Sequence, residues 1–324
     1  MDFHLTFPIL PFTQKINYTN KILLAGSCFA ENIGETMHTH KFNVRTNPNG
    51  VLFNPASIAI ALRRIIENKK MQENELFFAN ECWNSWEHHS RFSKPDKSNC
   101  LSEINKSIST TNEFIKKADW LFITFGSAFV YKHNSNGMLV GNCHKVPQKE
   151  FAKSLLTVSE IVADYNLLLQ QLKAVNSKLK VVFTISPVRY IRDGVVKNNI
   201  SKARLIEAVH ELVNQHNNSF YFPAYELVID DLRDYRFYKQ DLVHPNEQAI
   251  QYVFEKLVNT TFDEDTKILF EKIKDIITAK QHLPFNADTE AYRKFQDTYL
   301  KRCEQIQKDH SFLDFDNELE FFGK

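Results

Sequence analysis

Two short segments of the sequence carry side chains that could act together as a nucleophile and its base. In the first, Gly26-Ser27-Cys28 ends the β-rich run KILLAG and leads into a segment of helical period. Glycine permits a sharp turn, and a helix N-terminus offers unpaired N–H groups that stabilise a thiolate or an oxyanion. The same pattern is also typical of a plain strand-to-helix turn with a buried cysteine. Ser27 and Cys28 are therefore candidate nucleophiles.

The second segment is DLVHPN, in which Asp241 and His244 stand three residues apart. A carboxylate at this spacing can orient an imidazole that acts as a base. Pro245 disfavours helical geometry at His244, so we expect a loop that projects the ring toward the sheet edge. A DxxH pair also occurs in solvated turns, so by itself it does not identify a catalytic site.

Five short β-rich runs are expected to position these side chains. Their nearly continuous apolar character is typical of parallel strands covered on both faces, with helices in the connections. Right-handed crossovers with one reversal predict the strand order 2-1-3-4-5 in a three-layer, flavodoxin-like α/β/α sandwich, whose ligands bind at the carboxyl edge of the sheet. The runs cover residues 21–26, 41–46, 120–126, 180–186 and 220–222.

Helices are predicted wherever apolar residues recur at intervals of three or four. Asn246 is expected to cap the last helix of the sandwich. The segment 74–111 is predicted to be long and irregular, as lids and binding loops are. After about residue 261 the pattern turns to charged helices, so we expect an α/β domain over residues 1–262 and a helical extension over 263–324 that packs on it. The stripes of the sandwich run over 29–37, 161–175, 205–213 and 250–258.

Composition narrows the classes of function. Lys and Arg number 40 against 39 Asp and Glu, which gives no field to attract nucleic acid or an anionic membrane. Five scattered cysteines without CxxC spacing predict reduced thiols and a cytoplasmic location, and no run is long enough to span a membrane. The spacing of His88, His89, Cys143 and His144 fits no metal site, and no cofactor is expected. Richness in Lys, Asn, Ile and Phe suggests an AT-rich bacterial genome.

A series of sequence blocks resembles one family over nearly all of the chain. This resemblance to the GSCFA family, itself similar to the SGNH (GDSL-type) hydrolases that cleave acyl esters of carbohydrates, lipids and other alcohols, implies a nucleophile after the first strand and a DxxH pair near the end. Those positions are Gly26-Ser27-Cys28 and Asp241/His244. The blocks are ILLAGSCFAENIG, NPNGVLFNP, GNCHK, SPVRYIRDG, SKARL, YFPAYELVIDDLRDYRFY and DLVHP, followed by LPFNA.

The chain departs from the SGNH pattern at two places. The serine of the GDS motif stands two residues after glycine, and that register selects Cys28, with Ser27 kept as the alternative. The resemblance also implies oxyanion donors at a glycine after the second strand, matched by Gly50, and at an asparagine whose place is taken by Ala128. Asn142 in the block GNCHK could replace that missing donor, and so could Asn47 or Asn54, which flank Gly50 in the block NPNGVLFNP.

Further residues are candidates for contact with a substrate. Arg189, at the end of the fourth strand, could hold an anionic group, and His89 with Trp86 could line the cleft; Tyr235 and Arg236 are expected to buttress the DLVHPN loop. The leading hypothesis is an ester hydrolase or acyltransferase acting on a small-molecule or glycan acyl ester. The alternatives are a non-catalytic ligand-binding module with the same fold, and an interaction protein that uses its charged C-terminal helices. Neither the substrate nor the oligomeric state is predicted.

Overall fold

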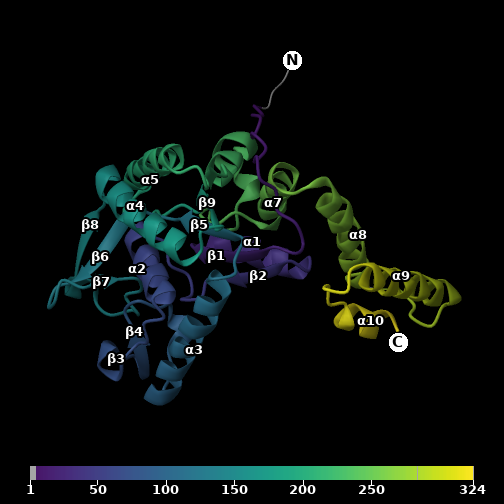
Figure 1. Ribbon diagram of the computed structural model, residues 1–324, viewed down its shortest axis with the longest axis horizontal. Helices are drawn as coiled ribbons and strands as arrows, with labels where there is room; N and C mark the ends of the chain where they lie inside the picture. Colours follow the sequence, from purple (N-terminus) through teal and green to yellow (C-terminus); the bar gives the residue numbers. More distant parts are fainter. Residues whose placement is uncertain (1–4, 283, 324) are drawn as a thin grey trace.

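The computed structural model describes residues 5–282 and 284–323 and is built around one parallel sheet (Figure 1). Residues 1–4, Leu283 and Lys324, which include the outer ends of both expected domains and the first residue of LPFNA, lie outside the described residues. The sheet order is β10-β9-β5-β1-β2, with every neighbouring pair parallel. Numbered along the chain, this is the predicted order 2-1-3-4-5, which is confirmed. The strands are β1 (Lys21–Gly26), β2 (Asn43–Thr46), β5 (Trp120–Phe125), β9 (Lys180–Ile185) and β10 (Ser219–Tyr221).

Alternate residues of the strands enter two separate cores, one on each face of the sheet. Ile22 and Leu24 of β1 belong to the core that also holds side chains of α1 and α7, whereas Leu23 belongs to the core formed with α2, α4 and α5. Such burial on both faces explains the continuous apolar runs in the sequence. The helices of these two layers are α1 (Cys28–Thr39), α2 (Pro55–Ile66), α4 (Val158–Val175), α5 (Val195–Gln215) and α7 (Glu247–Thr261), with the short α6 (Ala224–Glu226) after β10.

Local capping sets where the helices begin. The side chain of Asn246 accepts a hydrogen bond from the Ala249 N–H at 3.1 Å, so the predicted cap of α7 is confirmed. Thr157 and Glu160 form a capping box at the start of α4. These bonds satisfy amide groups that have no partner inside the helix. The cap of α7 fixes the point at which the DLVHPN loop ends.

The expected irregular segment 74–111 is more ordered than predicted. It contains the hairpin of β3 (Leu76–Ala79) and β4 (Cys82–Ser85), and its second half is the beginning of α3 (Lys97–Ile115). The helix is polar, and its buried face relies on Cys100, Ile104 and Ile108, a narrow stripe with a spacing of four. A three-stranded antiparallel sheet was also not predicted, and its order is β7-β6-β8, with β6 (Phe129–His133), β7 (Leu139–Val140) and β8 (Phe151–Leu155).

The C-terminal part of the chain is helical, and in Figure 1 it extends from the end of the molecule opposite β6–β8. Its last helix is linked to the segment after α1 by an ion pair between Lys41 and Glu318. None of the helices in the described part of the chain combines the length and the apolar character that a membrane crossing requires. The elements are α8 (Glu264–Lys280), α9 (Glu290–Asp309) and α10 (Asp316–Phe322).

Candidate active site

The turn after β1 depends on a glycine that no other residue can replace. Gly26 has φ +144°, and a Cβ there would lie 2.2 Å from the Thr124 carbonyl oxygen of β5. The turn is fixed on both sides, because the Ser27 N–H donates to Thr124 O at 3.1 Å and the Asn47 Oδ1 accepts from the Gly26 N–H at 2.9 Å. Residues 27 and 28 therefore leave the carboxyl edge of the sheet in one orientation.

Ser27 and Cys28 have different surroundings in this turn. Ser27 is the N-cap of α1, is 3% exposed, and its Oγ accepts from the Phe29 N–H at 3.3 Å. Cys28 is the first residue of the helix and is partly exposed. Because the serine oxygen already has a structural partner, the sulfur is the freer of the two nucleophile candidates.

Opposing effects act on the Cys28 thiol. Burial raises its pKa, while the N–H groups of Cys28 and Phe29 and the charge of Lys202 act to lower it. The carboxylate of Glu31 adds to the increase. The net pKa lies above the ordinary value of a cysteine, so the thiol needs a proton acceptor to become a nucleophile at neutral pH.

Asp241 and His244 form the hydrogen-bonded pair that the sequence suggested. The Asp241 Oδ2 lies 2.7 Å from the His244 Nδ1, and the Oδ1 accepts from the N–H groups of Val243 and His244 at 2.9 and 3.0 Å. These bonds lower the pKa of Asp241 to about 2, so the carboxylate is ionised at neutral pH. An ionised Asp241 places the imidazole proton on Nδ1 and leaves Nε2 as an acceptor.

The DLVHPN loop is held at the same edge of the sheet as the nucleophile turn. The Arg189 N–H, after β9, donates to Val243 O at 3.2 Å, and the Arg189 guanidinium lies over the rings of Tyr235 and Tyr238. Arg189 therefore contacts the loop itself. Within the described residues, His244 makes no hydrogen bond to Ser27 or Cys28, so the joining of the two halves stays a prediction.

The candidate oxyanion donors differ in what they contact. The Gly50 N–H donates to Asn47 O at 2.7 Å. The Oδ1 atoms of Asn47 and Asn54 are engaged by Gly26 and Ser57, while their Nδ2 atoms are buried without a partner among the described residues. Two amide groups close to the turn thus have a donor to spare, and Asn47 is bonded directly to Gly26.

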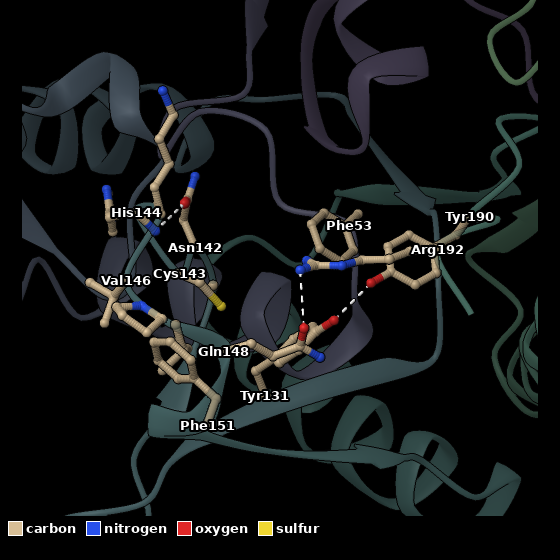
Figure 2. A pocket seen from close by; sticks show the side chains of 14 residues that line it. Phe53, Tyr131, Asn142, Cys143, His144, Val146, Gln148, Phe151, Tyr190 and Arg192 are labelled. Carbon is tan, nitrogen blue, oxygen red and sulfur yellow. Dashed lines mark hydrogen bonds between the residues drawn. The ribbon is translucent and has the colours of Figure 1, made fainter. Parts of the chain in front are cut away.

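Asn142 and Phe53 both line a cavity of about 600 Å³. Figure 2 shows Phe53 and Tyr190 facing the segment 142–148 across this cavity, with Tyr131 and Phe151 below. The Tyr131 and Tyr190 hydroxyl groups are 2.7 Å apart, and Arg192 donates to Gln148 at 3.2 Å.

The Phe53 carbonyl links this cavity to the nucleophile turn. It accepts from the N–H groups of Gly126 and Ser127 at 2.7 and 2.9 Å, which ties Phe53 to the segment beside Ser27. The charged side chains that line the cavity are Lys145 and Arg192, and no carboxylate is among the lining residues that the structure describes. The cavity is therefore suited to a ligand with both an apolar part and polar or anionic groups.

Neither His89 nor Trp86 is among the residues that line the cavity beside Phe53. His89 packs on Gly50, where an added Cβ would lie 2.2 Å from the His89 Cβ. Burial lowers the pKa of the His89 imidazole, and the Glu31 carboxylate of α1 opposes that decrease. Trp86 stacks on Phe77 at 3.6 Å between ring centres. Across residues 5–282 and 284–323, no three His, Cys, Asp or Glu side chains converge as a metal site would require.

Two side chains of α5 reach the strand end where the SGNH asparagine is missing. The Ser201 Oγ accepts from the Ala128 N–H at 2.8 Å, and the Lys202 Nζ donates to Gly126 O at 2.7 Å. Sequence reasoning gave neither residue a role. The block SKARL was the available signal, since a lysine beside a serine on the buried stripe of a helix is unusual.

The parallel sheet with helices on both faces, a candidate nucleophile turn after its first strand and an Asp–His pair before α7, the last helix of the sandwich, define the class as a three-layer α/β protein. The chain belongs to the GSCFA family, whose model matches residues 21–257; a second model, the C-terminal domain of GSCFA domain proteins, matches residues 273–324. None of the curated proteins matches the sequence.

Several solved structures are similar to this one. A carbohydrate esterase of family 3 from Talaromyces cellulolyticus is 12% identical, with a TM-score of 0.35 over 79% of this chain and 99% of that one. An acetyl xylan esterase from Butyrivibrio proteoclasticus is 10% identical, with a TM-score of 0.38 over 75% of this chain and 63% of that one. A family 3 carbohydrate esterase from Clostridium thermocellum is 12% identical, with a TM-score of 0.32 over 77% of this chain and 96% of that one.

Proposed function

We propose that the protein is an acyl-ester hydrolase or acyltransferase that uses Cys28 as its nucleophile and the Asp241–His244 pair as its acid–base group. The observation that carries this proposal is the 2.7 Å bond between Asp241 and His244 Nδ1, in a loop that is itself bonded to Arg189 in the segment following β9. An imidazole held in this way has Nε2 available for a proton, which is the arrangement that nucleophilic acyl transfer requires.

The reaction then follows in two steps. The Cys28 sulfur attacks the acyl carbonyl, its proton passes to His244 Nε2, and the carbonyl oxygen takes up the negative charge. When the tetrahedral intermediate collapses, the C–O bond breaks, the alcohol leaves with the proton from His244, and a thioester to Cys28 remains. Water, or another alcohol, activated by His244 then releases the acyl group. The proposed donors for the oxyanion are the N–H groups at the start of α1 and the amide of Asn47, whose Oδ1 is bonded to Gly26.

The cavity beside Phe53 is proposed as the substrate pocket. Its aromatic side chains can pack on a sugar ring or an acyl chain, and Asn142, Gln148 and Arg192 can bind hydroxyl or anionic groups. This combination favours an acyl ester of a carbohydrate or of a lipid head group. If the cavity binds such a molecule without turnover, the protein is instead a ligand-binding module of the same fold, a possibility that Ala128 at the usual asparagine position favours.

Hydrolysis of short-chain aryl esters and thioesters by wild type, Cys28→Ala, Ser27→Ala and His244→Ala tests the proposal. We expect Cys28→Ala and His244→Ala to lose activity by about 10³-fold or more. Ser27→Ala is expected to keep activity with reduced stability. Cys82→Ala is the matched control, because Cys82 is a partly exposed cysteine in the β4 hairpin, remote from the turn.

Intact-mass measurement separates the outcomes further. A transient gain of one acyl group on the wild type, absent in Cys28→Ala, identifies the thioester. A folded wild type that neither turns over nor acylates, but binds acylated sugars, would contradict the enzyme assignment and support the binding module.

A further inference from the structure

The cavity beside Phe53 contains two hydrogen-bonded pairs of side chains. The Arg192 guanidinium donates to the Gln148 Oε1 at 3.2 Å, and the hydroxyl groups of Tyr131 and Tyr190 lie 2.7 Å apart. All four residues line the cavity, and the ring of Tyr190 stacks on that of Phe53 with 6.2 Å between their centres. Figure 2 shows both pairs on the side of the cavity next to Phe53. These four residues form the donor cluster.

The hydrogen bonds inside the donor cluster leave it with unused donors. The bond between Tyr131 and Tyr190 uses one of two hydroxyl hydrogens, so the other remains whichever group donates. Burial raises the pKa of Tyr131 to about 12, so its hydroxyl keeps its hydrogen at neutral pH. A guanidinium has several N–H groups and no acceptor, and Arg192 uses few of them on Gln148. Because the Gln148 oxygen accepts from Arg192, its amide N–H groups are also left as donors.

The positive charge of Arg192 has no partner of opposite sign. Within the described residues Arg192 forms no ion pair, and no described carboxylate lines the cavity. Its neighbour Asp193 is engaged elsewhere, because it forms an ion pair with Lys153. The Lys153 ammonium also donates to the Tyr190 hydroxyl at 3.4 Å and lies 5.3 Å from the centre of the Tyr131 ring. The donor cluster therefore combines neutral donors with an uncompensated guanidinium.

A negatively charged group with several acceptor oxygens complements such a cluster. A carboxylate or a phosphate accepts paired N–H bonds from a guanidinium in a fixed geometry, and these bonds are stronger than those between neutral groups. Lys145 is the second cation of the lining and adds positive charge. The rings of Tyr131 and Phe151, which also line the cavity, offer an apolar surface on which a sugar ring can pack.

We propose that the donor cluster binds the oxyanion of an anionic sugar, so that the substrate is an acyl ester of a sugar that carries a carboxylate or a phosphate. This inference rests on the proposed function in taking the cavity as the substrate pocket. Arg192 then determines specificity and takes no part in the chemical step. Three residues earlier, the Arg189 N–H donates to Val243 O, so one segment binds the anion and contacts the loop of His244.

Binding of three sugars that lack an ester tests this without turnover. Glucuronate carries a carboxylate, glucose 6-phosphate carries a phosphate, and methyl glucoside carries neither. Titration of the full chain followed by ligand-observed NMR gives each Kd. We expect at least one anionic sugar to bind about tenfold or more tightly than methyl glucoside, because hydrogen bonds to a charged group are the stronger ones. Comparison of the two anionic sugars distinguishes a carboxylate from a phosphate as the preferred group.

Variants of one exposed arginine isolate the donor cluster. Arg192→Gln should weaken binding of the anionic sugar by about tenfold and leave methyl glucoside unchanged. Arg192→Lys keeps the charge but loses the paired geometry, so its Kd should fall between those of Arg192→Gln and wild type. Lys197→Gln is the matched control, because it removes the same charge from an exposed residue of α5 that does not line the cavity.

Kinetics on acetylated sugars provide a second readout. Arg192→Gln should raise KM for acetylated glucuronate or acetylated glucose 6-phosphate by about tenfold, with little change in kcat, because the anion is bound alike in the ground state and the transition state. Neither constant should change for acetylated methyl glucoside.

The inference is wrong if neither anionic sugar binds more tightly than methyl glucoside, or if Arg192→Gln and Lys197→Gln bind the anionic sugars equally well. Its failure differs from failure of the proposed function. A chain that binds anionic sugars through Arg192 but hydrolyses no ester would support the donor cluster and contradict the hydrolase. A chain that hydrolyses acetylated methyl glucoside but binds no anionic sugar would do the reverse.

Discussion

The Asp241 carboxylate is exposed to solvent and also accepts several hydrogen bonds. Three hydrogen bonds, from two backbone N–H groups and one imidazole, reach its two oxygens. This explains why its pKa falls to about 2 although solvent surrounds it. A carboxylate with a lowered pKa keeps its charge as the pH falls, until the pH approaches that pKa. Any loss of activity between pH 7 and 4 must therefore arise from another group.

The change Asp241→Asn tests the orienting role of this residue. The amide can still accept from the Val243 N–H, but it cannot hold the proton of His244 Nδ1 as a carboxylate does, so we expect kcat to fall by about 10²–10⁴-fold. The measurement is kcat on an aryl ester from pH 4 to 9. Asp234→Asn is the matched control, because Asp234 caps the Arg236 N–H at 2.8 Å in an exposed turn nearby. Equal activities of the two variants would contradict the proposed orientation of the imidazole.

At the scale of elements, the approach of β1 to β5 requires glycine at the nucleophile turn. Gly26→Ala would combine a strained φ of +144° with a Cβ 2.2 Å from Thr124 O, and we expect a loss of about 2–5 kcal/mol in the free energy of unfolding. Gly137→Ala is the control, because Gly137 has φ +69° with no atom within 4 Å of an added Cβ.

Urea unfolding followed by circular dichroism measures both changes. Strain alone should cost Gly137→Ala about 1 kcal/mol. Similar losses in the two alanine variants would mean that the backbone of β5 moves aside freely and that the turn is not rigid.

The sheet was predictable from the sequence because strands buried on both faces must be apolar throughout. The run KILLAG needs no tertiary information, since Ile22 and Leu23 enter opposite cores. The helix α3 was not predicted, because its buried side is a narrow stripe on a polar sequence. The contacts of Lys202 could not be read from its residue type, since lysine is usually exposed and only the packing of α5 onto the strand ends buries it.

At the scale of the whole molecule, one buried carboxylate links α10 and α8 to the sandwich. Glu318 of α10 is 6% exposed, and its oxygens lie 2.6 Å from the Nζ of Lys41, after α1, and 3.1 Å from that of Lys280, at the end of α8. The Lys41 ammonium also lies 5.2 Å from the centre of the Phe315 ring. Lys41 follows the helix that begins at Cys28, so this contact connects the C-terminal helices to the element that carries the proposed nucleophile.

Glu318→Ala should loosen that connection while leaving the catalytic edge intact. Removing a buried carboxylate leaves two lysines unpaired, and since both ammonium groups are partly exposed, we expect a loss of about 1–3 kcal/mol in the free energy of unfolding. Faster proteolysis between α8 and α9 should accompany it. Glu290→Ala, which breaks the exposed Glu290–Lys294 pair of α9, should change stability by less than about 0.5 kcal/mol. If both variants unfold at the same urea concentration and are cleaved at the same rate, hydrophobic packing alone holds α10, because the core around Phe315 and Phe322 is common to both.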